Sequence, residues 1–157
     1  MKFFERIRRE EGAAAVEFAL IVGVLAMLIF GMLQYGLAFF QLQNLRSATR
    51  EGARIGAMGG SVDEMRAQIE SQSRIAGLGS SVVVKTRTGG TLSGAVTPSS
   101  TRPCVVESGS PPDSVQTSIP LSGAPQSLKD IFTVDIPLMP TISLLNATVE
   151  GEFRCES

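Results

Sequence analysis

The chain has 157 residues, and its 14 basic and 15 acidic side chains give a net charge of −1. Because no basic patch stands out, we do not expect a nucleic-acid partner. Histidine is absent, no nucleophile has a recognisable base, and no segment shows metal-ligand spacing or a phosphate-binding loop. We therefore predict no enzymatic activity, no cofactor, no metal and no small-molecule substrate.

A long hydrophobic segment lies near the N-terminus. Residues 18–45 contain no charged side chain, and as a helix these 28 residues would be about 42 Å long. The hydrocarbon core of a membrane needs about 20 residues. Four basic residues precede the segment, and the bias in Lys and Arg places that end in the cytoplasm; they are Lys2, Arg6, Arg8 and Arg9. We expect a single-pass membrane protein with its N-terminus in the cytoplasm and its C-terminal domain exported.

A cleaved secretory signal peptide is the first alternative. Such a peptide has an apolar region of about 7–15 residues followed by small residues at the cleavage site. Here the apolar stretch is too long, and the small residues 12–15 come before it. Cleavage after the hydrophobic segment is therefore not expected.

The start of the hydrophobic segment has a distinctive spacing. Gly12 follows the basic leader, and Glu17 is the only acid within the apolar run. An acid near a helix start is tolerated at the membrane interface, which is one interpretation of Glu17. The other interpretation uses the spacing, which resembles the processing site of type IV pilin-like precursors. A cut between Gly12 and Ala13 would place Glu17 fifth in the new chain, where it could neutralise the new α-amine.

Further motifs narrow the resemblance. Residues 13–20 read AAAVEFAL, Phe30-Gly31 follows, and residues 50–54 read REGAR. Together these resemble the TadE-like pseudopilins of the Flp/Tad pilus, and residues 132–138 and 145–154 are loosely similar to the ending of that family. Glu10 and Glu11 depart from the pattern, since they dilute the positive charge of the leader.

The resemblance implies a minor pilin that supports assembly of an adhesive pilus. Its partners would be the membrane, a prepilin peptidase, other pilins or pseudopilins, and Tad assembly components. The implied domains are a leader at 1–12, a long helix at 13–58 and an exported domain at 59–157. The mature subunit would either stay in the membrane or enter the pilus.

Small residues recur along the predicted helix. Ridges of this kind let a second helix approach closely, and glycine is costly in a helix unless it is packed. We therefore name two sets as helix-packing candidates: Ala15, Ala19, Gly23 and Gly31 in the membrane, and Ala48, Gly52 and Gly56 beyond it. The second set could pack on its own domain or on another subunit. Arg46, Arg50 and Arg54 form a cationic stripe that we interpret mainly as a solvated face.

The remaining residues predict a small α+β domain. Ser61 and Glu64 form a capping-box pattern for a short helix ending near Ile75. Strands are predicted at 81–87, 131–137 and 147–153, giving an antiparallel sheet of about three to four strands. Glycine, serine, threonine and proline make up most of residues 88–127, which we interpret as an irregular loop with one candidate strand at 104–107.

The two cysteines, Cys104 and Cys155, both follow the hydrophobic segment. In an oxidising compartment they would close a loop of about 50 residues, with a stabilisation of roughly 4 kcal/mol in the chain-entropy model. Two unrelated buried thiols are the alternative. The disulfide would anchor the irregular loop to the final strand.

Three other functions remain as alternatives. An uncleaved, membrane-anchored binding protein would use the helix only as an anchor. A major pilin would form the filament shaft, but the major subunits of the Tad system carry little beyond the helix. An anchored enzyme has no positive feature in this sequence.

Overall fold

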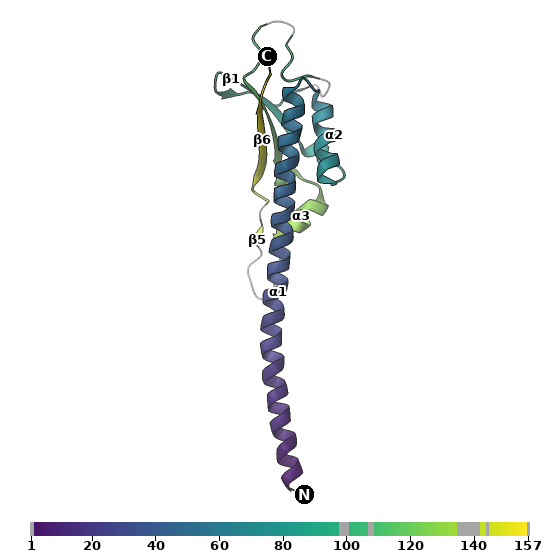
Figure 1. Cartoon of the computed structure of the whole chain (residues 1–157), viewed down its shortest axis with the longest axis vertical. Helices are drawn as coiled ribbons and strands as arrows, with labels where there is room; N and C mark the ends of the chain where they lie inside the picture. Colours follow the sequence, from purple (N-terminus) through teal and green to yellow (C-terminus); the bar gives the residue numbers. More distant parts are fainter. Residues whose placement is uncertain (1, 98–100, 107–108, 135–141, 144, 157) are drawn as a thin grey trace.

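The computed structural model describes residues 2–97, 101–106, 109–134, 142–143 and 145–156. A single helix runs the whole length of the molecule, and a small domain surrounds its upper end (Figure 1). The helices are α1 (Lys2–Ala57), α2 (Val62–Ser73) and α3 (Gln126–Phe132). The strands are β1 (Val83–Thr88), β2 (Thr91–Leu92), β3 (Ser114–Pro120), β4 (Thr133–Val134), β5 (Ile142–Ser143) and β6 (Thr148–Arg154). Two 3₁₀ turns lie at Leu78–Ser81 and Leu121–Gly123. The predicted α+β class is confirmed.

Helix α1 has 56 residues and is therefore about 84 Å long. No proline interrupts it. The side chains from Gly12 to Leu37 are exposed or partly exposed, and the first buried residue is Ala38, at 2% exposure. Over the described part of the chain, the stretch Gly12–Ala57 is the single helix that is long and apolar enough to cross a membrane.

The domain has two layers. One is a four-stranded antiparallel sheet with the order β2-β1-β3-β6. The other is the upper half of α1 with α2 beside it, and α1 contacts α2, β3 and β6. A second sheet pairs β4 with β5. The largest fully buried side chains between these elements are Leu45, Met65, Ile69, Leu78, Ile119, Leu121, Leu128 and Phe132.

Helix α2 begins as the sequence predicts. The side chain of Ser61 accepts a hydrogen bond from the Glu64 N–H, and the Glu64 carboxylate accepts one from the Ser61 N–H at 2.8 Å. The helix ends at Ser73, two residues before the predicted end, because Arg74 takes a left-handed backbone conformation with φ of 57°. The Arg74 N–H donates to the Glu70 carbonyl oxygen and closes the last turn.

The prediction of an irregular loop over 88–127 is wrong for its second half. Strand β3 lies there and occupies the interior of the sheet, and every residue from Ser114 to Ile119 is buried. Its polar side chains Ser114 and Gln116 bond to Glu152 and Glu150 of β6, so its composition is that of a loop while its environment is that of a core strand. The candidate strand at 104–107 is absent over the described residues 104–106.

The strand predicted at 131–137 is also corrected. Ile131 and Phe132 form the end of α3, because Leu128 and Phe132 are one turn apart and both are buried. Extended structure is limited to Thr133–Val134, and residues 135–137 lie outside the described part. The strand predicted at 147–153 is confirmed as β6, which spans Thr148–Arg154.

Candidate functional site: the long helix and its two junctions

The N-terminal junction lies on a part of α1 that none of the described residues of the domain covers. Gly12, Ala13 and Glu17 are exposed, and a Cβ added at Gly12 would meet nothing within 4 Å. Ala13 and Glu17 are four residues apart on one continuous helix, so their Cβ atoms face the same side at about 5–6 Å. A new amine at Ala13 would therefore be within reach of the Glu17 carboxylate. The cleavage itself stays a prediction.

The small residues in the lower half of α1 lie on an open surface. Ala15, Ala19 and Gly23 are exposed, and a Cβ at Gly23 would meet nothing within 4 Å. Gly31 lies on an open apolar groove of about 790 Å³ that Val24, Met27, Leu28, Met32, Tyr35, Gly36 and Phe39 also line. This half of α1 has room for another helix or for lipid, and its packing role stays a prediction.

The small residues in the upper half of α1 pack within their own domain. Ala48, Gly52 and Gly56 are buried. A Cβ at Gly52 would lie 2.5 Å from Ile69 Cδ1, and one at Gly56 would lie 2.6 Å from Met65 Sδ. The absent side chains let α2 lie directly against α1. Within this chain, Gly52 and Gly56 therefore face α2.

The closest approach of β6 to α1 occurs at Gly151. A Cβ there would lie 2.6 Å from both the carbonyl carbon of Thr49 and the nitrogen of Arg50. Beside this crossing, the buried Thr117 Oγ1 donates to the Thr49 carbonyl oxygen at 2.7 Å. The sequence analysis did not single out Gly151 and missed this contact. A glycine inside an otherwise strong strand is the signal that points to it.

The disulfide between Cys104 and Cys155 is confirmed. Their Cα atoms are 5.5 Å apart across a sequence separation of 51 residues. The Cys155 N–H donates to the Asp113 carbonyl oxygen at 3.1 Å, and the Glu156 N–H donates to the Ala57 carbonyl oxygen at 3.4 Å. The C-terminal segment is therefore held to the upper end of α1 and to the segment that leads into β3.

The outer face of the sheet carries a small charged network. Arg87 Nε lies 2.8 Å from Glu152 Oε1, and Ser114 Oγ donates to the same carboxylate. The hydrogen bond from Arg87, followed by the one from Ser114, lowers the pKa of Glu152. On α1, Arg46 and Arg50 are exposed, while Arg54 pairs with Glu51 at 3.1 Å. Both features fit solvated surfaces.

Across the residues whose placement is described, no group of three or more His, Cys, Asp or Glu side chains could hold a metal ion. The geometry instead presents a long accessible apolar helix, a helix start with an exposed glycine and acid, and a compact domain attached at the other end.

Comparison with known proteins agrees with this arrangement. Residues 12–54 match the family model described as TadE-like protein. No curated protein and no solved structure matches the chain. The matched segment begins at Gly12, contains Glu17, and includes all of the candidate small residues except Gly56. The family points to association with the Flp/Tad pilus and to a structural kind of protein. Over residues 12–54, the predicted resemblance to TadE-like proteins is confirmed.

Proposed function

We propose that this protein is a minor pilin or pseudopilin that supports assembly of the Flp/Tad adhesive pilus. In this proposal it is inserted in the bacterial inner membrane with its N-terminus in the cytoplasm and its domain in the periplasm. A prepilin peptidase cuts the chain between Gly12 and Ala13. The mature helix then contacts other pilins or pseudopilins, either within the membrane or within the pilus.

The single observation that carries this proposal is the arrangement at the helix start. Gly12 has open space around it, Ala13 and Glu17 share one side of α1, and none of these residues contributes to the folded domain. Glycine also has a low helix propensity, so the backbone at Gly12 opens more readily than the alanine-rich helix that follows. A peptidase could therefore engage the junction without disturbing the domain.

Replacing Gly12 with leucine tests the cleavage. We expect Gly12→Leu to accumulate as the full-length chain in cells that contain the peptidase, because the side chain would occupy the bond to be cut. The matched control is Gly23→Leu, since a Cβ at Gly23 also meets nothing within 4 Å. N-terminal sequencing and intact mass of membrane-derived protein should show wild type and Gly23→Leu beginning at Ala13.

The opposite result would favour a different protein class. If the wild-type chain begins at Met1 in those cells, or if Gly12→Leu still supports pilus formation, the helix is only an anchor. An uncleaved, membrane-anchored binding protein would then be the better description. Counting pili by electron microscopy in addition to the sequencing distinguishes a loss of cleavage from a loss of assembly.

A further inference from the structure

The exposed apolar surface of α1 is longer than a bilayer needs. It begins after Glu17 and continues to Phe40, and Leu37 and Phe40 are still 63% and 65% exposed. A span of 20 residues from Phe18 reaches Leu37, which corresponds to the hydrocarbon thickness of about 30 Å. If the hydrocarbon layer covered a stretch of α1 closer to the N-terminus, it would submerge Glu17 and leave Leu37 and Phe40 in water.

The opposite shift is also unfavourable. Moving the helix further into the membrane would bring Gln41, and then the folded domain, into the hydrocarbon layer. Polar groups at the edge of the domain, such as the Asp130 carboxylate, would lose their contact with water. The two ends of the apolar surface therefore fix the depth of the helix to within about one turn.

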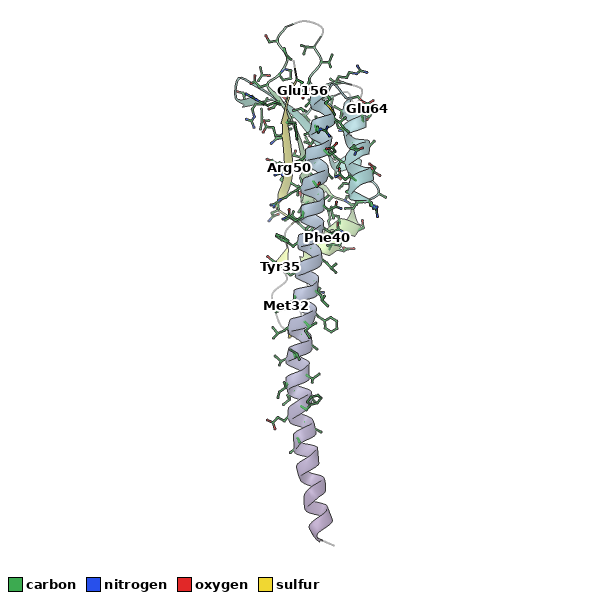
Figure 2. All side chains as sticks on the ribbon, in the orientation of Figure 1. Met32, Tyr35, Phe40, Arg50, Glu64 and Glu156 are labelled. Atoms are coloured by element: carbon green, nitrogen blue, oxygen red, sulfur yellow. A yellow bond between two sulfur atoms is a disulfide. The ribbon has the colours of Figure 1, made fainter. Side chains whose placement is uncertain are left out.

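At this depth the lower edge of the domain reaches the membrane surface. Asp130 and Ile131 of α3 line a cavity of about 200 Å³ together with Gln34, Leu37 and Gln41 of α1. Figure 2 shows Phe40 at the level of α3 and Tyr35 at the level of β5. Gln41 is four residues, or about 6 Å, beyond Leu37, and each headgroup layer is about 5–7 Å thick. Helix α3 therefore falls within that layer.

The residues at this level suit a membrane interface. Phe39 is exposed at this level, and Tyr35, the one tyrosine of the chain, is exposed one turn below it. A tyrosine near the interface is favoured because its hydroxyl group can extend to the headgroups. Within the described part of the chain, the buried Oε1 of Gln41 has no hydrogen-bond partner. The Gln41 residue lines the small cavity at this level.

We propose that α3 and the adjoining turn of α1, residues 38–41, are seated in the phospholipid headgroup layer. The domain then rests directly on the bilayer and does not stand clear of it on a helical stalk. This inference rests on the membrane anchoring in the proposed function, but not on the cleavage or on which side the domain occupies. The exposed part of α3, including Ser127 and Asp130, is the surface that lipid contacts.

Tryptophan fluorescence offers a direct test, because the chain contains no tryptophan. The full chain is reconstituted in vesicles of phosphatidylethanolamine and phosphatidylglycerol, with bromine atoms either at the headgroup end or at the terminal end of the acyl chains. Ser127→Trp and Asp130→Trp report on α3. Leu28→Trp, near the middle of the span, and Thr91→Trp, on the exposed strand β2, are the two controls.

We expect the fluorescence from at least one α3 position to be quenched most by bromines at the headgroup end. Leu28→Trp should be quenched most by bromines at the chain end, and Thr91→Trp by neither. Each variant should still form the Cys104–Cys155 disulfide, which verifies the fold. If both α3 tryptophans are as unquenched as Thr91→Trp, the seating is wrong. If the wild-type chain does not float with vesicles at all, the anchoring in the proposed function fails first.

Discussion

The two halves of α1 use the same kind of residue for different purposes. In the upper half, Gly52 and Gly56 are buried against Ile69 and Met65, and no larger side chain would fit without movement. In the lower half, Gly23 and Gly36 have nothing within 4 Å of an added Cβ. The upper half is therefore a completed helix–helix contact, whereas the lower half is a surface available to lipid or to another subunit.

This difference shows that small-residue spacing does not by itself identify a subunit interface. The sequence carries comparable patterns in both halves, and only the presence of α2 distinguishes them. Stability of the domain should depend on the upper half alone, and anchoring on the lower half alone. Substitutions that change the stability of the domain without changing its anchoring, or the reverse, therefore test this difference between the two halves.

Loss of the disulfide should have the largest effect on the domain. In Cys155→Ser, we expect the free energy of unfolding of the domain to fall by about 4 kcal/mol, since a closed loop of this length no longer restricts the unfolded chain. Chemical denaturation in detergent, followed by circular dichroism, measures the loss. Flotation with vesicles should be unchanged, because the hydrogen bond from the Glu156 N–H to the Ala57 carbonyl oxygen places the disulfide at the upper end of α1. Equal unfolding midpoints for variant and wild type would contradict this prediction.

A leucine at Gly52 should have the next largest effect. Its side chain would overlap Ile69 and approach the Met65 carbonyl oxygen, which would lie 3.3 Å from the Cβ. We expect a loss of about 3 kcal/mol in the same unfolding measurement. Gly23→Leu is the matched control, and the domain should unfold as in wild type. Comparable losses in both variants would mean that the two halves are not independent.

Local signals in the sequence predicted part of this fold well. The span of α1 follows from an unbroken apolar run without proline, and the start of α2 follows from Ser61 and Glu64, whose bonds lie within one turn. Strand β3 could not be predicted in this way. Its Ser114 and Gln116 are stabilised by β6, more than 30 residues later in the chain, and no short-range pattern records such a partner.

The residues of the candidate site also differ in whether local sequence or a distant contact determines their role. The cysteine pair was predicted from its residue type and place in the chain and is confirmed. The roles of Gly12 and Glu17 follow from spacing and stay predictions. The role of Gly151 depends on where α1 crosses β6, so the sequence indicated only an unusual glycine in a strand. The seating proposed for α3 could not be anticipated either, because no helix was predicted there: residues 126–127 were assigned to the irregular loop and residues 131–132 to a strand.

The smallest expected effect concerns the charged network on the sheet, whose contribution to the stability of the domain depends on pH. Arg87, and then Ser114, lower the pKa of Glu152 below its ordinary value of 4.5. A carboxyl group whose pKa is lower in the folded state stabilises the fold above its unfolded pKa, and this stabilisation is lost as the pH falls through the folded pKa. Glu152→Gln should therefore be slightly less stable than wild type at neutral pH.

The difference in stability between wild type and Glu152→Gln should narrow once the pH falls below about 4.5, because the wild-type Glu152 then becomes protonated. Thermal unfolding across a pH series measures it, with Glu156→Gln as the control for an exposed acid near the same strand. A difference that persists unchanged at low pH would show that Glu152 acts through packing and not through its charge. Glu152 already has its partners within the domain, whereas the proposed partner of Glu17, the new amine at Ala13, is created only when the chain is cut.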